Sequence, residues 1–259
     1  MPRMKRIRRL AALTLAALTL AGNALASDSS GFDPSNKEQL GQFVHDYLVQ
    51  HPEVLLDAQD ALQAKQQQAA QKKVAKVIAD NRQALYYAPG DLVLGDPDGS
   101  VTLVEFYDYN CPYCRAAVSD MKTIVANEKG LRYVLKEFPI LGDDSMAASR
   151  ASMAFEMLAP NKFKTFHDRL MAIKGSADAE RAEKIAADLG VDPKQLEAKM
   201  KDPKIGARIR QTYALADKLN LTGTPAYVVG DMAVSGVIGA DALRKAIGNV
   251  RACGSTTCS

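Results

Sequence analysis

Four cysteines are the residues of this sequence best suited to covalent chemistry, and they form two local pairs. Cys111 and Cys114 enclose a Pro-Tyr dipeptide, whereas Cys253 and Cys258 are separated by four residues. A thiolate can attack a disulfide bond, and a second thiolate nearby can then resolve the mixed disulfide and release the product. Cross-links between residues so close in sequence stabilise a large fold little, because the loop that they close is short. At least one pair is therefore expected to serve chemistry.

The first pair lies between a predicted strand and a predicted helix. Residues 101–107 are rich in β-branched and aromatic side chains, and residues 112–127 show helical spacing. A thiol at a helix N-terminus faces unpaired amide N–H groups and the positive end of the helix dipole, and both favour the thiolate. We predict Cys111 to be the attacking nucleophile and Cys114, about one turn further on, to be the resolving thiol. Pro112 suits the first helical turn, where an N–H group would have no partner.

The Cys111–Cys114 pair also has other possible uses. A structural zinc site would need two more ligands, and the three histidines show no paired spacing near the motif. An inert disulfide would gain little stability from so short a loop. The reduced thiolates could bind Cu(I), a soft metal ion, so a copper-binding protein is a rival hypothesis. We expect no resident metal or other cofactor, only the redox-active disulfide itself.

The first 26 residues predict an export signal. Five basic residues precede an uncharged apolar stretch, residues 10–21, and Ala24 and Ala26 supply the small side chains that a signal peptidase recognises. The apolar stretch is shorter than the ~20 residues that a membrane-spanning helix needs. We therefore expect cleavage after about Ala26, with no retained membrane anchor. Export would deliver the cysteines to the periplasm, where disulfides form and persist.

Loss of this leader changes the charge of the chain. Lys plus Arg falls from 33 to 28 while Asp plus Glu stays at 30, so the formal net charge goes from +3 to −2. Binding to nucleic acid depends on clustered Lys and Arg side chains that contact phosphates. A nearly neutral mature chain gives that class no support, and we expect no nucleic-acid partner.

Residues 27–90 are predicted to form a helical segment outside the main domain. An apolar face follows its first helix at three- and four-residue spacing, and a second helix begins near Pro52. The middle of the second helix, residues 63–73, is rich in Gln, Ala and Lys and poor in core residues. Such a helix can lie solvated on the main domain, or it can pack against the same face of other subunits. We favour self-association, carried by residues 40–62.

The rest of the chain, residues 91–259, is predicted to be an α/β domain with a helical insertion. A strand, a helix and a strand are followed by a helical block at about residues 143–220, then by two strands and a final helix. A Pro-Gly turn at residues 88–91 marks the start of the domain. Asp144 is expected to cap the first helix of the insertion. The strands are expected at residues 92–94, 101–107, 131–138, 226–229 and 232–235.

Two motifs resemble the DsbA-like branch of the thioredoxin superfamily. Residues 104–110, Val-Glu-Phe-Tyr-Asp-Tyr-Asn, run into Cys-Pro-Tyr-Cys as in that branch. Residues 222–227, Thr-Gly-Thr-Pro-Ala-Tyr, look like the superfamily's cis-proline loop before a strand. The resemblance implies a thioredoxin fold with an inserted helical subdomain. It also implies that Pro225 faces Cys111 in space and that the Thr224 backbone pairs with a substrate peptide.

Glu105 precedes Cys111 by six residues, where the family often has an acidic group beneath the active site. Burial would raise the pKa of this carboxyl and allow it to relay a proton to or from Cys114. An ordinary carboxylate on the strand surface is the alternative. Lys136, on the following strand, is the expected charge partner of Glu105.

The resemblance also bears on the direction of the reaction. Tyr113 stands where family oxidases often have a histidine that favours the thiolate, so a less oxidising centre is expected. Thr224 before the cis-proline resembles disulfide isomerases more than oxidases. Residues 46–53 resemble the helical N-terminal extension of suppressor-of-copper-sensitivity protein C (ScsC) and its relatives, which oligomerise through it, often as trimers.

These likenesses imply a homo-oligomeric disulfide isomerase or reductase, with a trimer favoured. Its substrates would be misfolded or cysteine-containing periplasmic proteins, and a membrane thiol donor of the DsbD or ScsB type would keep it reduced. A dithiol oxidase of the DsbA type, which donates its own disulfide to new cysteines, is the alternative.

The second cysteine pair departs from the common family pattern. Its spacing, next to a Gly-Ser-Thr-Thr segment, suits a small structural disulfide between Cys253 and Cys258. A second redox or metal-binding pair is the alternative, although no basic groups or further ligands stand nearby in the sequence.

Overall fold

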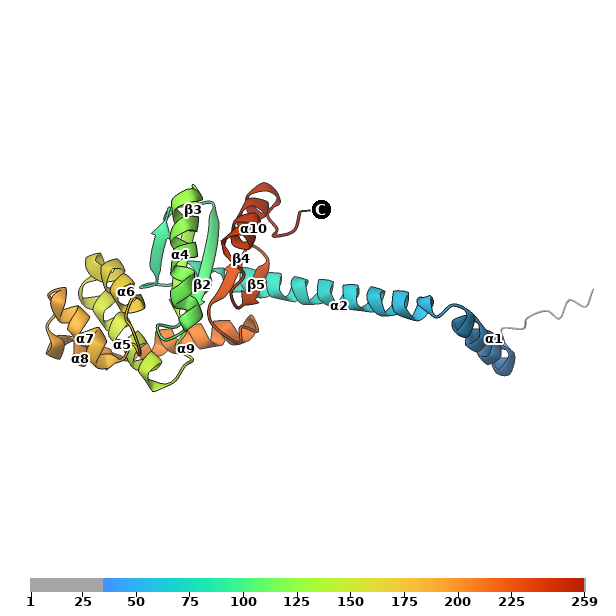
Figure 1. The fold of residues 1–259 in the computed structure, drawn as a ribbon, viewed down its shortest axis with the longest axis horizontal. Coiled ribbons are helices and arrows are strands. Elements are labelled where there is room, and N and C mark those ends of the chain that lie inside the picture. The colour runs from blue at the N-terminus through green and yellow to red at the C-terminus, as the bar shows by residue number, and fades with distance from the viewer. Residues whose placement is uncertain (1–34, 259) are drawn as a thin grey trace, which may run out of the picture. The chain divides into compact units, whose positions relative to one another are not determined.

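The computed structural model describes residues 35–258, so the predicted signal peptide lies outside the described residues. The chain divides into two compact units after Gln59, and this boundary falls inside a helix. The first unit contributes α1 (Lys37–Gln50) and the beginning of α2 (Glu53–Asp80), both labelled in Figure 1. The predicted pair of helices on either side of Pro52 is confirmed. The predicted domain boundaries at residues 26 and 90 stay predictions.

The described part of the first unit has no core of its own. The side chain of Asn36 caps α1 by accepting two backbone N–H groups of the first turn, but no side chain of α1 is buried. No helix within residues 35–258 is long and apolar enough to cross a membrane. Large apolar side chains lie exposed along α1 and the start of α2: Leu40, Phe43, Val44, Tyr47, Val49, Leu55 and Leu56.

The second unit is built on a five-stranded mixed sheet with the strand order β1-β3-β2-β4-β5. β2 and β3 run parallel, and every other neighbouring pair is antiparallel. The predicted strands and the α/β class are confirmed. The strands are β1 (Leu92–Gly95), β2 (Val101–Tyr107), β3 (Leu131–Glu137), β4 (Ala226–Val229) and β5 (Met232–Ser235).

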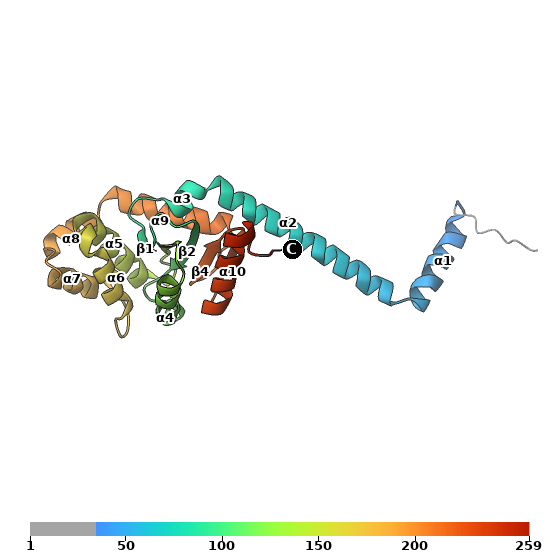
Figure 2. The same cartoon turned by 90° about the horizontal axis from the view of Figure 1, so that it is seen from above.

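Helices cover both faces of this sheet. α4 (Pro112–Asn127) and α10 (Ala240–Cys253) lie on one face, and α3 (Arg82–Tyr86) and α9 (Pro203–Lys218) lie on the other (Figure 1, Figure 2). Successive side chains of a strand point to opposite faces, so β2 supplies both cores. Its contributions to the α4 side are Val101, Leu103 and Tyr107, and those to the other side are Val104 and Phe106.

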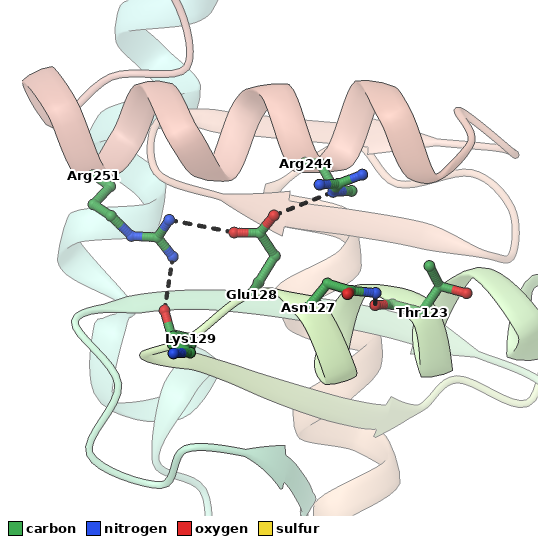
Figure 3. Close-up of polar contacts among 6 residues, drawn as sticks. All are labelled: Thr123, Asn127, Glu128, Lys129, Arg244 and Arg251. Atoms are coloured by element: carbon green, nitrogen blue, oxygen red, sulfur yellow. Dashed lines mark hydrogen bonds and ion pairs between the residues drawn. The ribbon is translucent and has the colours of Figure 1, made fainter.

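A charged cluster joins α10 to the end of α4 (Figure 3). The Glu128 carboxylate accepts Arg244 Nε and Arg251 Nη1, each across 3.2 Å. Arg251 Nη2 also donates to the Lys129 carbonyl across 3.0 Å. Both arginines are exposed, so these ion pairs contribute only about 1 kcal/mol or less each to stability. Their main effect is to fix α10 beside the helix that carries the cysteines.

The predicted helical insertion lies between β3 and β4. Its core includes a stacked pair of rings, Phe155 and Phe166, whose centroids are 4.3 Å apart. Besides α9 and a short 3-10 helix (Pro160–Lys162), it consists of α5 (Asp143–Leu158), α6 (Phe163–Met171), α7 (Ala179–Asp188) and α8 (Pro193–Met200).

The prediction that Asp144 caps the first inserted helix is wrong. α5 already begins at Asp143, after Gly142, and no side chain bonds the first backbone N–H groups of this helix. Gly142 has a φ of +100°, a backbone conformation that glycine adopts without a steric cost. Asp144 instead accepts the Ser176 hydroxyl across 2.6 Å, from the loop after α6.

Candidate active site at the start of helix α4

The first cysteine pair lies where β2 passes into α4. Cys111 is the N-cap residue of α4, and its Sγ accepts the backbone N–H of Cys114 across 3.4 Å. Pro112 is the first helical residue, as its missing N–H group allows. Both cysteines are free thiols and both are buried, whereas Tyr113 between them is 64% exposed. The motif is therefore open to solvent through Pro112 and Tyr113, whereas both sulfur-bearing residues lie beneath the surface.

The cis-proline loop meets this turn from far along the chain. The Thr224–Pro225 peptide bond is cis, and β4 begins directly after it. β4 pairs with β2 so that Ala226 lies opposite Phe106, and this register brings the loop beside the first turn of α4. The thiol of Cys111 donates to the Thr224 carbonyl across 3.1 Å. The structure thus brings Thr224 and Pro225 together with the cysteine that the sequence proposes as nucleophile.

Asp108 fixes the turn that precedes Cys111, and sequence reasoning missed it. Its carboxylate accepts the backbone N–H of Asn110 across 2.7 Å and those of Ile140 and Leu141 across 2.8 and 3.1 Å. Its carbonyl accepts the N–H of Cys111 across 3.1 Å. A fully buried carboxylate with three N–H donors is well compensated, so it links the redox turn firmly to the loop after β3. An Asp two residues before an Asn is a signal of such a turn.

Glu105 lies beneath the redox pair on the α4 face of the sheet. It is only 3% exposed, so the interpretation as a strand-surface carboxylate is wrong. Tyr133 Oη donates to Glu105 Oε2 across 2.7 Å, and Tyr227 of β4 lies directly opposite in the register. Burial raises the pKa of Glu105 to about 7, and the hydrogen bond from Tyr133 partly opposes that shift. The group can therefore exchange a proton near neutral pH.

The prediction that Lys136 is the charge partner of Glu105 is also wrong. Glu105 lies opposite Leu135 in the parallel register, so Lys136 points to the other face of the sheet. There its ammonium pairs with the Asp91 carboxylate across 2.5 Å. The group beside Glu105 is therefore the neutral phenol of Tyr133, not the expected cation. Because a neutral donor stabilises the carboxylate less than a cation would, the pKa of Glu105 stays raised.

The thiol of Cys114, the proposed resolving cysteine, stays protonated at neutral pH in this environment. Burial raises the pKa of Cys114 well above that of an ordinary thiol, and negative charge on Cys111 or Glu105 raises it further. Cys114 therefore needs a proton acceptor before it can attack a mixed disulfide.

A buried polar chain runs beside the site, between the sheet and the insertion. Tyr109 Oη is hydrogen-bonded to Ser152 Oγ across 2.8 Å and to His167 Nδ1 across 3.1 Å, and Ser152 Oγ donates to Glu137 Oε1 across 2.8 Å. Tyr107 Oη donates to Tyr109 Oη. Burial raises the pKa of Glu137 to about 8 and lowers that of His167 to about 4. Near pH 7 both side chains are therefore neutral, as a buried network requires.

The second cysteine pair lies at the opposite end of β4 from the redox turn. A disulfide joins Cys253 and Cys258 at the end of α10. Asp231, in the turn between β4 and β5, accepts the hydroxyls of Ser255 and Thr256, each across 2.6 Å. Within residues 35–258 no group of three or more Cys, His, Asp or Glu side chains is arranged to bind a metal ion. The loop that the disulfide closes is thus tied to the hairpin through Ser255 and Thr256.

Comparison with protein families identifies the second unit. Residues 102–248, more than half of the chain, match the DSBA-like thioredoxin domain. The chain belongs to the DSBA-like thioredoxin family. The resemblance seen in the two sequence motifs is thereby confirmed, as is the fold that it implied. In addition, residues 36–69 of this family member match the copper resistance protein ScsC N-terminal domain.

Solved structures support the same assignment. A thioredoxin-like oxidoreductase from Silicibacter pomeroyi DSS-3 is 40% identical to this chain, with a TM-score of 0.63 over 67% of this chain and 99% of that one. The catalytic domain of Proteus mirabilis ScsC is 28% identical, with a TM-score of 0.61 over 69% of this chain and 98% of that one.

Curated relatives match part of the chain at 26–30% identity. Disulfide bond formation protein D of Bacillus subtilis is 26% identical over 168 residues, which cover 61% of this chain and 76% of that protein. A Na(+)/H(+) antiporter NhaA of Salinispora tropica is 27% identical over 157 residues. The chain spans only 24% of the length of that antiporter.

Proposed function

We propose that this protein is a thiol–disulfide oxidoreductase that acts on protein substrates, with Cys111 as nucleophile and Cys114 as resolving thiol. The observation that carries the proposal is the position of Cys111 at the N-terminus of α4, bonded to the Cys114 amide and to the Thr224 carbonyl. The Cys114 amide N–H and the N-terminal end of α4 both face the Cys111 sulfur, which is the atom that would attack a substrate disulfide. Cys114, buried behind it, stays protonated until it is needed.

The reaction begins when the Cys111 thiolate attacks a substrate disulfide. The substrate S–S bond breaks, a Cys111–substrate disulfide forms, and the leaving thiolate takes a proton from solvent. In isomerisation, another substrate thiolate then attacks the mixed disulfide and regenerates the Cys111 thiolate, with no net oxidation. In reduction, Cys114 attacks Cys111 Sγ, which releases the reduced substrate and leaves the Cys111–Cys114 disulfide as the oxidised form of the enzyme. No other cofactor is needed for either route.

Glu105 is the proton acceptor that we propose for Cys114. Its pKa of about 7 means that a substantial fraction is ionised at neutral pH. The carboxylate can therefore take the Cys114 proton as the thiol attacks, and return it when Cys114 is again the leaving group.

Replacement of Glu105 by glutamine (Glu105→Gln) should slow the Cys114-dependent release of a mixed disulfide at pH 7.5 by roughly tenfold to a hundredfold. In the native protein this step should accelerate as the pH rises through about 7, where the carboxyl loses its proton, and level off above it. Tyr133→Phe removes the donor that lowers the pKa of Glu105, so the rise should move to higher pH. Stopped-flow release of a preformed mixed disulfide, measured from pH 5.5 to 9 (roughly the useful range for these pKa values), checks this. An unchanged pH profile in Glu105→Gln would contradict the assignment.

We propose that the protein isomerises or reduces substrate disulfides and does not act as a dithiol oxidase. The groups hydrogen-bonded to Cys111 Sγ, the Cys114 amide and the Thr224 carbonyl, are both neutral. Tyr113 occupies the position of the histidine found in family oxidases and supplies no positive charge. A Cys111 thiolate with less stabilisation makes the disulfide less oxidising. The Thr224 backbone is proposed to pair with a substrate strand that lies across Cys111.

The first unit is proposed to join several copies of the chain, with a trimer favoured. The match of residues 36–69 to the ScsC N-terminal domain supports this proposal. So does the row of large apolar side chains that α1 and the start of α2 expose. Helices with an exposed apolar face gain stability by packing against one another, since that removes the face from water. Several redox centres in one assembly can hold one misfolded protein while its disulfides are exchanged.

The double variant Val44→Asp/Leu55→Asp tests both the assembly and the isomerase proposal. The two native side chains are 44% and 57% exposed, so the variant should fold but should sediment as a monomer. Reactivation of scrambled ribonuclease should drop several-fold, whereas reduction of a small disulfide should not change. Gln66→Asp/Gln67→Asp, which adds the same two negative charges at exposed polar positions of α2, is the matched control. A native protein that oxidises reduced ribonuclease but does not reactivate the scrambled form would favour the oxidase.

Location and electron supply follow from the same proposal. We propose export to the periplasm, with cleavage after about Ala26, and reduction of Cys111–Cys114 by a membrane thiol donor of the DsbD or ScsB type.

A second candidate function, copper binding, is favoured by the match to an N-terminal domain named for copper resistance. In it, the thiolates of Cys111 and Cys114 bind Cu(I). Stoichiometric Cu(I) uptake that Cys111→Ser abolishes, without any exchange activity in the native protein, would support that alternative.

A further inference from the structure

The loop that joins α6 to α7, residues 172–178, belongs to the helical insertion but is bonded to the redox turn. We call it the α6–α7 loop. Asn110 and Arg115 make these bonds, and they flank the cysteine pair in the sequence: Asn110 directly precedes Cys111, and Arg115 directly follows Cys114. The insertion and the redox turn are thus connected at the site of the chemistry itself.

Arg115 bonds to three backbone carbonyls, and its Nη2 also donates to Asn110 Oδ1 across 3.4 Å. Its Nη1 donates to the carbonyls of Ile173 and Gly175 across 3.0 and 2.8 Å, and its Nε donates to that of Tyr109 across 2.8 Å. No carboxylate in the described part of the chain lies within ion-pair distance of Arg115. A planar fork with five N–H donors can bind several carbonyls at once, whereas an ammonium cannot match that geometry. The side chain therefore clamps the loop to the turn before Cys111.

Asn110 adds a second, two-bond connection. Its Nδ2 donates to the Ala177 carbonyl across 2.9 Å, and the Ala177 N–H donates to its Oδ1 across 2.6 Å. Ala177 is fully buried, but the middle of the loop, Lys174 to Ser176, is exposed. Clamped at both ends of this exposed stretch, the loop lies against Asn110, the residue directly before Cys111, and exposes its backbone polar groups and the Lys174 side chain to solvent.

We propose that the α6–α7 loop is a contact surface for the polypeptide that flanks a substrate disulfide, and that Arg115 is the positioning residue that fixes it in shape. The inference rests on the proposed function, since it concerns how a protein substrate reaches Cys111. Because Cys111 is buried, a substrate sulfur must approach between the groups that border it. The bordering groups include Thr224 and, through Asn110, this loop. A loop ordered in advance spares the substrate the entropy cost of ordering it on binding.

The test uses the full-length mature protein carrying Cys114→Ser, in which the attack by Cys111 is isolated from resolution. Second-order rates of mixed-disulfide formation are measured with scrambled ribonuclease and with hydroxyethyl disulfide, a small neutral compound. Arg115→Ala should lower the rate with ribonuclease about tenfold and leave that with the small disulfide within about twofold, the loss expected of charge-assisted hydrogen bonds. Hydrogen exchange of the amides at residues 173–177 should become faster. The ribonuclease rate of Arg115→Lys should lie between those of the parent protein and Arg115→Ala, because one ammonium cannot span both loop carbonyls.

Arg169→Ala is the matched control, since Arg169 lies on α6 and makes only an exposed ion pair with Asp188. It should change neither rate. An equal fall of both rates in Arg115→Ala would show that Arg115 acts on Cys111 itself and would overturn the contact-surface proposal. Faster exchange in the loop with an unchanged ribonuclease rate would overturn it as well. If Cys114→Ser reacted with neither disulfide, the proposed function would fail before any loop variant was tested, and the two failures are therefore distinguishable.

Discussion

Replacement of Cys111 by serine is expected to reduce thiol–disulfide exchange by at least about a thousandfold, because a serine hydroxyl is not ionised at neutral pH and cannot replace the thiolate. Cys114→Ser should behave differently. The attack by Cys111 stays intact in that variant, but no thiol remains behind it to resolve the product. The variant should therefore accumulate a covalent complex with scrambled ribonuclease, which non-reducing electrophoresis and intact-mass measurement detect.

The asymmetry between the two cysteines follows from their surroundings. Cys111 is the N-cap residue and touches the Cys114 amide, whereas Cys114 is fully buried in the first turn of α4. The double variant Cys253→Ser/Cys258→Ser serves as a control, because that pair lies at the other end of β4, and it should leave exchange unchanged. A trapped complex formed by Cys111→Ser and absent from Cys114→Ser would reverse the two roles.

The redox centre is assembled from segments that are distant in sequence, and the central strand β2 organises all of them. β2 carries Glu105 and leads into the redox turn, its parallel neighbour β3 supplies Tyr133, and its antiparallel neighbour β4 begins at the cis-proline loop. The pairing of β2 with its two neighbours therefore determines the relative positions of Glu105, Cys111 and the Thr224 carbonyl. A change in that register would separate all three, which explains why chemistry and fold depend on the same strand.

Much of this architecture was predictable from local patterns. The strands, the helix after the cysteines and the helical insertion follow from periodicity, and the position of Cys111 at the helix start follows from Pro112 and the strand before it. The approach of Thr224 to Cys111 is a different matter. The two residues are 113 positions apart, and only the family resemblance implied their proximity.

The errors concerned which side chains face one another. Lys136 was expected beside Glu105 because both lie on neighbouring strands, but alternation along β3 directs it to the opposite face. A parallel register taken from the strand ends would have placed Leu135 opposite Glu105, with Tyr133 as the nearest polar side chain of β3 on the same face. Arg115 and Glu137 gave no signal, since their partners lie on the insertion and depend on how it packs against the sheet. Such contacts follow from tertiary packing, which no short pattern encodes.

Glu137→Gln is expected to stabilise the protein at alkaline pH, because it replaces a buried ionisable group of the sheet by a neutral amide. In the native protein, Glu137 Oε1 accepts Ser152, whereas Glu137 Oε2 and Ser149 Oγ, although near enough for Ser149 to lower the pKa of the carboxyl, make no well-formed hydrogen bond among the described residues. Burial raises the pKa of Glu137 to about 8. A carboxyl that binds its proton more tightly in the folded state than in the unfolded chain makes folding less favourable as the pH rises from about 4.3 to that value.

Comparison of the native protein with Glu137→Gln between pH 6.5 and 8 isolates this effect. His167, whose pKa burial lowers to about 4, is neutral in the folded state throughout that range and binds a proton only in the unfolded chain, where its pKa is about 6.5. That contribution is common to both proteins and cancels in the comparison. Glu137 should then cost the native protein about 2 kcal/mol of unfolding free energy between pH 6.5 and 8, and Glu105 adds to the slope until about pH 7.

Urea unfolding at several pH values, in a background that lacks Cys111 and Cys114 so that no thiol titrates, measures the slope. Glu137→Gln should remove most of it and Glu105→Gln only the smaller part. The new amide stays neutral at every pH and can donate to Ser149 Oγ, so its advantage should grow with pH. Equal slopes in the native protein and Glu137→Gln would mean that Glu137 is ionised in the folded state. In that case the chain from Glu137 through Ser152 to Tyr109 would contain a buried charge, and the insertion would be bound to the sheet by electrostatics instead of by a neutral network.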